Sequence, residues 1–271
     1  MYRLISVMLI LMVSMGCAKS KVETINVAGS TAFQPFAEKL AEEFMAAHPD
    51  VRVNVQGGGS AVGIQSAQAG VVQIGMADLV TLPKEAEGLN SIVAAKDAIV
   101  VIVNPANKVD SLSLQQIQDI FSGKLNNWGQ LGREKGEKGE KGEKKPIAIV
   151  SREEGSGTRD SFHDLVLKGV HLSPHALIQN STGAVRLMVE SDVSAIGYIT
   201  HGVVTPEVKT IAIDGISPSP QNIHDGKYNI VRPIFLLIKG EPVGSAKEFI
   251  DFILSPKGQK VIADNGLLPV K

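Results

Sequence analysis

The feature that most constrains the fold is a repeated order of apolar strand, glycine- and hydroxyl-rich loop, and amphipathic helix. Residues 22–27 have the character of a strand, and the apolar residues of 31–47 recur at the i, i+3 and i+4 spacing of a helix. The alternating pattern at 51–55 predicts the next strand, and a short helix is expected over 61–69. Strands that alternate with helices usually pack as a parallel sheet covered by helices. The sequence therefore predicts an α/β fold.

The second half of the chain repeats this order. An apolar run at 98–103 predicts a buried strand. Further helices are expected over 114–121, 159–167, 184–190 and 246–254, and further strands over 147–150, 195–199 and 234–238. Ser255-Pro256 should end or kink the helix before it, with 258–264 continuing as its final turns. A chain of 271 residues can hold one large domain or two of about 100–150 residues.

The N-terminus has the pattern of a targeting segment. Its apolar run, 4–13, is shorter than the roughly 20 residues of a membrane span and is typical of an export signal. Small residues precede Cys17, which resembles the lipobox of bacterial lipoproteins, although Ser14 stands where that pattern usually has Leu. We expect a signal peptide over 1–16, a lipid on Cys17, and a tether over 17–21. The alternative is an ordinary signal peptide with an incidental cysteine.

Composition argues against several classes of protein. With 27 basic and 28 acidic residues the net charge is −1, which disfavours nucleic-acid binding. Aromatic residues make up only 4%, which disfavours stacking platforms for bases or sugars. A single cysteine leaves no internal disulfide and no thiolate-rich metal site, and no cofactor is expected. Gly-Glu-Lys occurs three times in succession within 133–145, which predicts a mobile, solvated loop without chemistry.

Three loops place glycine and hydroxyl residues directly before an expected helix. They are 29–32 (Gly-Ser-Thr-Ala), 58–61 (Gly-Gly-Ser-Ala) and 155–158 (Gly-Ser-Gly-Thr). A helix N-terminus leaves backbone N–H groups unpaired and carries partial positive charge, so it can hold an oxyanion. One such loop alone is more often a plain helix cap. Three in one α/β chain favour an anion site, and none fits a dinucleotide or P-loop fingerprint.

Two charged residues sharpen this prediction. Arg152 stands three residues before Gly155, and a guanidinium suits paired hydrogen bonds to an oxyanion. Asp78 follows the expected strand 74–77, at the sheet edge where α/β proteins bind ligands. An ionised carboxylate only accepts hydrogen bonds, so Asp78 would attract hydrogen phosphate and repel sulfate. The alternatives are a surface ion pair of Arg152 with a neighbouring glutamate, and a turn-capping role for Asp78.

These segments together resemble the PstS-type phosphate-binding proteins of bacterial ABC transporters. The resemblance covers essentially the whole chain after the N-terminal segment, and its most specific part is 152–159. The matching segments are 28–32, 57–60, 74–78, 117–124, 127–128, 151–159 and 252–259. The chain departs from the family pattern at Ala61-Val62, where many members have Gly-Thr, and at Ala77, where Ser is frequent. These departures could weaken binding, but the charged pair is intact.

The resemblance implies a fold and a set of binding residues. The fold is a two-lobed periplasmic-binding-protein clamp, each lobe a mostly parallel sheet flanked by helices, with the ligand between the lobes. Residues 22–98 plus 232–271 would form lobe one, and 99–231 would form lobe two. The phosphate contacts carried over by position are Ser30, Thr31, Ala32 (through its N–H), Ser60, Asp78, Arg152, Ser156, Gly157 and Thr158.

The resemblance also implies a role and a location. The chain would be a monomeric, lipid-anchored receptor in the periplasm or on the outer face of the cytoplasmic membrane. It would deliver inorganic phosphate to the membrane subunits of an ABC permease, and it would not be an enzyme. Alternatives are a receptor for another oxyanion (arsenate, sulfate or molybdate), a phosphate-ester hydrolase with Ser30 or Ser156 as nucleophile, and a sensor or adhesin that lost transport. Neither serine lies in the G-x-S-x-G motif of many hydrolases.

Overall fold

The computed structural model describes residues 22–131 and 146–270. The expected signal peptide, the Cys17 tether and the Gly-Glu-Lys loop lie outside these ranges, so their assignments stay predictions. Within the two described ranges, no helix has both the length and the apolar character needed to cross a bilayer.

The described part of the chain builds one nine-stranded sheet. The strand order is β2-β1-β3-β11-β4-β8-β6-β7, with β9 paired to β4. The strands are β1 (Glu23–Gly29), β2 (Val51–Gln56), β3 (Ile74–Ala77), β4 (Leu89–Val103), β6 (Ala148–Arg152), β7 (Leu177–Gln179), β8 (Ala195–Thr200), β9 (Lys209–Thr210) and β11 (Val231–Lys239). A separate short pair joins β5 (Ser111–Leu112) to β10 (Ala212–Ile213).

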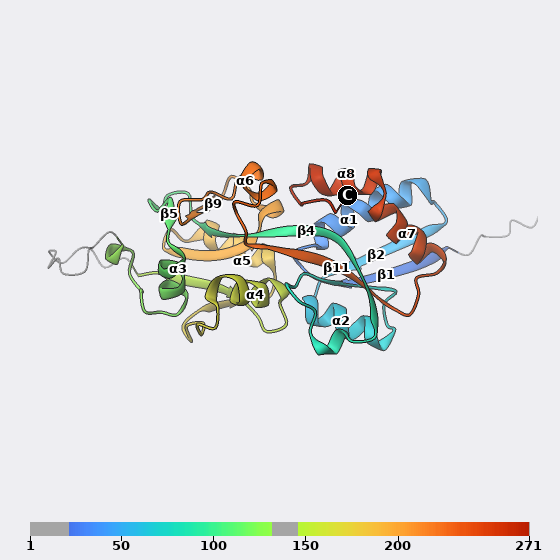
Figure 1. Ribbon diagram of the computed structural model, residues 1–271, viewed down its shortest axis with the longest axis horizontal. Coiled ribbons are helices and arrows are strands. Elements are labelled where there is room, and N and C mark those ends of the chain that lie inside the picture. Colours follow the sequence, from blue (N-terminus) through green and yellow to red (C-terminus); the bar gives the residue numbers. More distant parts are fainter. Residues whose placement is uncertain (1–21, 132–145, 271) are drawn as a thin grey trace, which may run out of the picture.

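Helices flank the sheet in both lobes (Figure 1). They are α1 (Gln34–Ala47), α2 (Ser60–Ala69), α3 (Leu114–Phe121), α4 (Gly157–Phe162), α5 (Thr182–Ser191), α6 (Pro220–His224), α7 (Gly244–Leu254) and α8 (Pro256–Asp264). One lobe has a core that includes Phe36, Leu40 and Phe249, and the other has a core that includes Phe121, Phe162 and Tyr198. Burial of apolar surface within each lobe gives the α/β fold that the sequence predicted, with the two lobes that the resemblance implied.

Two long strands, β4 and β11, connect the lobes and lie side by side (Figure 1). Strand β4 changes its partner along its length: the part before Ile99 pairs with β11, and the part from Ile99 onward pairs with β8. Both pairings are antiparallel, as is the pairing of β11 with β3. The prediction of a mostly parallel sheet therefore holds for β1 with β2 and β3, and for β6 with β7 and β8. It does not extend to the crossing strands, because a chain that leaves a lobe and later returns runs in the opposite direction.

Three helices differ most from their predicted bounds, whereas α2, α5 and α7 differ by one or two residues at an end. Helix α1 begins at Gln34 rather than at 31, because Ser30 caps a preceding turn by accepting a hydrogen bond from the Phe33 N–H at 3.0 Å. The helix expected over 159–167 is α4 followed by a π-helical stretch, His163–Leu167. The expected continuation at 258–264 belongs to a new helix, α8, whose N-cap Ser255 accepts a hydrogen bond from the Gly258 N–H at 3.2 Å.

Candidate anion-binding site

The three loops singled out in the sequence converge where the lobes meet. The loop after β1 and the loop after β2 are joined by the Gly59 N–H, which donates to the carbonyl oxygen of Gly29 at 2.9 Å. The loop after β6, in the other lobe, accepts a hydrogen bond at the Gly155 carbonyl from the Ala61 N–H at 3.1 Å. Gly59 is the N-cap of α2 with φ +92°, a backbone conformation that glycine adopts without the steric cost of a side chain.

Asp78 lies at the centre of this junction, directly after β3. Its side chain is 2% exposed. The Ser60 hydroxyl donates to Asp78 Oδ1 at 2.6 Å, and the Thr158 hydroxyl donates to Oδ2 at 3.2 Å. Ser60 comes from α2 of one lobe and Thr158 from α4 of the other. The Asp78 carboxylate therefore accepts hydrogen bonds from both lobes, which a residue that only caps a turn would not do.

Gly157, the first residue of α4, packs directly on this carboxylate. A Cβ at this position would lie 2.5 Å from the Asp78 carbonyl oxygen and 2.6 Å from Oδ1, and it would also overlap the Ser60 hydroxyl. Such distances leave no space for any side chain. The absence of a Cβ allows the start of α4 to approach Asp78 closely, which brings the helix N-terminus and its unpaired N–H groups to the junction.

Arg152 ends β6 and is 1% exposed. Its Nε and Nη2 donate to the two carboxylate oxygens of Glu153 at 2.8 and 2.7 Å, and its Nη1 donates to the Thr182 hydroxyl at 3.0 Å. A guanidinium has five N–H donors, so these contacts leave two for a ligand. An ion pair of Arg152 with a neighbouring glutamate was the alternative considered from sequence, and the pair with Glu153 is present. It is not a surface ion pair, however, because the Arg152 side chain is buried. Glu153 Oε1 lies 3.6 Å from the position of a Cβ on Gly59, so Arg152 belongs to the same junction.

The hydroxyl groups of the first loop and of the α4 start differ in their hydrogen bonding. Ser30 and Ser156 accept from the backbone N–H groups of Phe33 and Arg159 at 3.0 and 3.3 Å, so their own hydrogens remain available to donate. The Thr31 hydroxyl oxygen is buried and has no hydrogen-bond partner among the described residues. A buried hydroxyl without a partner is costly, and it indicates a ligand or water that completes the site.

Every residue predicted for the site therefore comes to one region of the structure. Ala32 follows Thr31 in the first loop and is buried, as are Ser30, Ser60, Ser156 and Gly157. The donors available to an oxyanion are hydroxyl groups, N–H groups at helix starts, and the Arg152 guanidinium.

Sequence reasoning missed two buried charges beneath Asp78, Arg232 on β11 and Asp97 on β4. Arg232 Nη2 lies 2.5 Å from Asp78 Oδ2 and 2.9 Å from Asp97 Oδ2. Asp97 also accepts a hydrogen bond from the Thr200 hydroxyl. Burial raises the pKa of the Asp97 carboxyl, although Arg232 and Thr200 oppose that rise. The sequence did hold a signal for both residues. Asp97 stands directly before the apolar run 98–103, Arg232 stands shortly before the apolar run 234–238, and a charged residue in a buried strand needs a partner.

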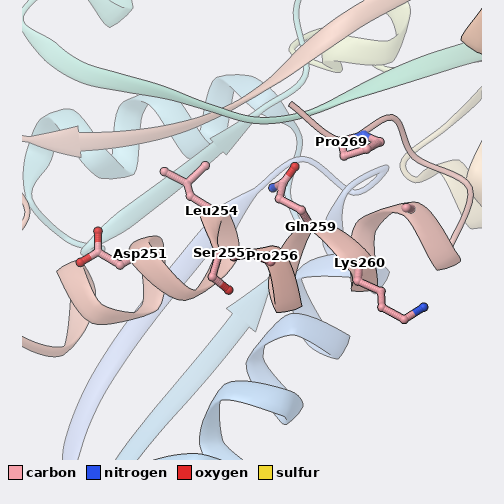
Figure 2. Close-up of a pocket in the computed structure, with 8 residues that line it drawn as sticks. Asp251, Leu254, Ser255, Pro256, Gln259, Lys260 and Pro269 are labelled. Atoms are coloured by element: carbon pink, nitrogen blue, oxygen red, sulfur yellow. The ribbon is translucent and has the colours of Figure 1, made fainter. Parts of the chain in front are cut away.

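A cavity of about 780 Å³ lies beside α7 and α8 (Figure 2). Its lining shares no residue with the junction of the lobes. The polar side chain of Gln259 there donates to the carbonyl oxygens of Ala94 and Ile253 at 3.0 and 2.9 Å and accepts from the Val270 N–H. Because Gln259 is engaged in bonds that hold the C-terminal helices to β4, this cavity offers less for an anion than the lobe junction.

The chain is similar along most of its length to proteins of known sequence and structure. A family model described as a PBP superfamily domain matches residues 18–257. The phosphate-binding protein PstS of Bacillus subtilis is 33% identical over 252 residues, which cover 91% of this chain and 81% of that protein.

Solved structures give the same assignment. A phosphate ABC transporter substrate-binding protein from Clostridium perfringens, solved with bound phosphate, is 37% identical, with a TM-score of 0.84 over 92% of this chain and 100% of that one. An ABC-type phosphate transport receptor from Vibrio cholerae is 33% identical, with a TM-score of 0.71 over 90% of this chain and 99% of that one. The chain therefore belongs to the PstS-type phosphate-binding proteins of the PBP superfamily.

Proposed function

We propose that this chain binds inorganic phosphate reversibly at the junction of its lobes and delivers it to the membrane subunits of an ABC permease. The observation that carries the proposal is the buried Asp78 carboxylate, which accepts hydrogen bonds from hydroxyl groups of both lobes. The relatives' printed names, which specify phosphate, support the same ligand.

The proposed contacts divide between the lobes. From lobe one we assign the Ser30 and Thr31 hydroxyls, the Ala32 N–H, Asp78 and Ser60, whose hydroxyl is used by Asp78 and whose N–H, at the start of α2, is the donor to the anion. From lobe two we assign the Arg152 guanidinium, the Ser156 hydroxyl, the Gly157 N–H and Thr158, whose hydroxyl is used by Asp78 and whose N–H, in the first turn of α4, is the donor to the anion. Charge-assisted hydrogen bonds of this kind contribute about 1.5–3 kcal/mol each. Several of them, less the cost of stripping water from the anion, are sufficient for micromolar or tighter binding, about −8 kcal/mol.

Asp78 would select the protonation state of the anion. A carboxylate has no proton to donate, so a ligand oxygen beside it must carry one. Hydrogen phosphate meets this condition near neutral pH, whereas sulfate is fully ionised and would be repelled. Asp78 is therefore proposed as the residue that separates phosphate from sulfate.

We also propose that closure of the lobes accompanies binding. Lobe one comprises 22–98 plus 232–271 and lobe two comprises 99–231 in this proposal, with β4 and β11 as the connections. An anion that contacts both lobes binds best when they are together, so it shifts the population toward the closed state.

The location and anchoring of the chain belong to the proposal as well. A lipid on Cys17 would hold the monomeric protein in the periplasm or at the outer face of the cytoplasmic membrane, beside its permease. The proposal includes no chemical step, so the chain would not be an enzyme. The Ser156 hydroxyl, weighed as a nucleophile, caps α4 by accepting from the Arg159 N–H.

Calorimetric titration of the chain without its first 17 residues tests the proposal. The unmodified protein should bind phosphate at micromolar or tighter affinity and sulfate much more weakly. Asp78→Asn should lose this preference, because an amide donates as well as accepts. Asp50→Asn, a matched change at an exposed aspartate, should keep it.

Three outcomes would contradict the proposal. They are absence of phosphate binding by the unmodified chain, tighter binding of sulfate or molybdate than of phosphate, and turnover of a phosphate monoester that Ser156→Ala abolishes. The last outcome would favour a hydrolase instead.

A further inference from the structure

A buried arginine outside the three anion-facing loops contacts the central carboxylate. Arg232 lies on β11, is 1% exposed, and holds Asp78 in two ways. Its Nη1 donates to the Asp78 carbonyl oxygen at 3.0 Å, and its Nη2 lies 2.5 Å from Oδ2 of the Asp78 side chain. The same guanidinium donates to Asp97 Oδ2 from Nε at 3.2 Å and from Nη2 at 2.9 Å. One cation is thus shared between two buried carboxylates.

The hydrogen-bond directions around Asp78 can be deduced from the acceptors that are already occupied. The Ser60 oxygen accepts from the Asp78 N–H at 3.1 Å, so the Ser60 hydrogen points to Oδ1 at 2.6 Å. The Thr158 oxygen accepts from Arg232 Nη2 at 3.0 Å, so its hydrogen points to Oδ2 at 3.2 Å. Ser60 and Thr158 therefore each donate a hydrogen bond to the Asp78 carboxylate. Arg232 adds an ion pair at Oδ2, because the two hydrogens of its Nη2 are already directed to Asp97 and Thr158.

A carboxylate has about four acceptor positions over its two oxygens. Hydrogen bonds from Ser60 and Thr158 fill one position at each oxygen, and the Arg232 cation lies against Oδ2. A proton on Asp78 itself would compete with these donors, so the network favours the charged form. The free position at Oδ1, on the side away from the Arg232 cation, can accept a proton that a ligand brings.

We propose that Arg232 is a positioning residue that determines anion specificity: it holds Asp78 as a charged proton acceptor, and so makes the site select a protonated oxyanion. The proposal rests on the proposed function. It adds that the selection of a protonated oxyanion depends on Arg232 of the connecting strand β11 as well as on Asp78. Arg232 acts through Asp78 and Thr158. It fixes the carboxylate with one guanidinium nitrogen and orients the Thr158 hydroxyl of the other lobe with the same nitrogen.

Removal of the cation should change the protonation of the site. Without Arg232, Asp78 and Asp97 would be two buried carboxylates with no paired cation, which is strongly unfavourable. The pair would take up a proton from solvent. An Asp78 that carries a proton becomes a donor, and a donor no longer rejects sulfate.

Calorimetric titration with phosphate and sulfate across a range of pH tests this on Arg232→Gln. We expect phosphate affinity to fall at least about tenfold and the phosphate-to-sulfate ratio to fall at least about tenfold, with the ratio partly restored as pH rises. Arg232→Lys keeps a positive charge without the fork and should lie between Arg232→Gln and the unmodified protein. Arg186→Gln, a change at a half-buried arginine of α5 that bonds Thr205 and Glu190 rather than Asp78, is the control and should leave the ratio unchanged.

A purely structural role for Arg232 predicts a different result. Both affinities would then fall by the same factor, the ratio would not depend on pH, and the proposal would be overturned. Failure of the unmodified chain to bind phosphate would instead overturn the proposed function, so the two failures can be told apart.

A measurement on the unmodified chain covers the case in which neither variant folds. Calorimetry in two mildly alkaline buffers with different ionisation enthalpies counts the protons exchanged when HPO₄²⁻ binds. A charged Asp78 requires a net exchange close to zero. Release of close to one proton would mean that Asp78 carries a proton before binding, which overturns the proposal.

Discussion

The backbone N–H of Ala61 donates to the carbonyl oxygen of Gly155 at 3.1 Å, and this hydrogen bond joins a loop of one lobe to a loop of the other. Asp78 adds a second connection, since it accepts from Ser60 on one side and from Thr158 on the other. The structure is thus a closed arrangement of the lobes, and residues that make close contact only in this arrangement should affect binding more than folding.

Gly157→Ala should weaken phosphate binding by at least about tenfold without destabilising the protein. A Cβ would overlap Ser60 and Asp78 only when the lobes are closed, whereas alanine favours the helix in the open state by up to about 1 kcal/mol. Titration calorimetry and thermal unfolding without phosphate measure the two effects separately. Gly183→Ala is the matched control at the start of α5, because a Cβ there meets no atom within 4 Å. Equal affinity of Gly157→Ala and the unmodified protein would show that closure does not require this contact.

Thr31→Val should lower phosphate affinity and leave the phosphate-free protein at least as stable as before. The lost bond from a hydroxyl to a charged ligand corresponds to about 1.5–3 kcal/mol, or about 10- to 150-fold in Kd. Valine also removes a buried hydroxyl that has no partner among the described residues. Thr31→Ser, which keeps the hydroxyl, should retain most of the affinity. A variant that binds phosphate normally but unfolds at lower temperature would assign the Thr31 hydroxyl to the fold instead.

Local patterns predicted much of this fold because their physical causes are local. The helix predicted over 114–121 has those bounds in the structure, since Ser113 and Gln116 form a capping box at its start. The strand predicted over 98–103 is only the second half of β4, which begins at Leu89. The first part of β4 was missed because it lacks the alternation of apolar and polar residues that is typical of a half-exposed strand. The consecutive residues Ala94 and Ala95 are both buried, in the core of lobe one.

The candidate site, like the fold, could be predicted only in part. Its loops could be predicted, because glycine and hydroxyl residues at helix starts have a chemical meaning that sequence shows directly. Arg232 could not, since its significance depends on Asp78 and Asp97, which lie more than a hundred residues away in the chain. Only the pairing of β11 with β3 and β4 brings these charges together, and that antiparallel pairing is a property of the whole topology.

Ser113→Ala should reduce stability and leave the binding site intact. The Ser113 hydroxyl accepts from the Gln116 N–H at 3.1 Å, and the Ser113 N–H donates to Gln116 Oε1 at 2.8 Å. Loss of such a cap costs about 1 kcal/mol. Chemical denaturation should show this decrease in the free energy of unfolding, while calorimetry shows an unchanged Kd for phosphate. Weaker phosphate binding by this variant would mean that α3 is coupled to the lobe junction, contrary to the local role assigned to the cap.

Asp97→Asn should change how stability depends on pH. Burial raises the pKa of the Asp97 carboxyl in the folded chain, so between its unfolded and folded pKa values the folded state binds more protons than the unfolded state. The free energy of unfolding then decreases as pH rises through that window, by at most about 1.4 kcal/mol per pH unit for one proton. Asparagine does not titrate, and it leaves Arg232 paired with Asp78 alone. The variant should therefore match the unmodified protein most closely at acid pH and gain stability relative to it as pH rises above about 4. Denaturation of both proteins over a pH series, without phosphate, measures this difference.

Glu207→Gln, at a fully exposed carboxylate whose pKa is lowered by a hydrogen bond from Thr205, is a control of opposite sign, because the contribution of Glu207 to stability should diminish as pH falls. A difference between Asp97→Asn and the unmodified protein that shrinks with rising pH would mean that Arg232 and Thr200 outweigh burial at Asp97.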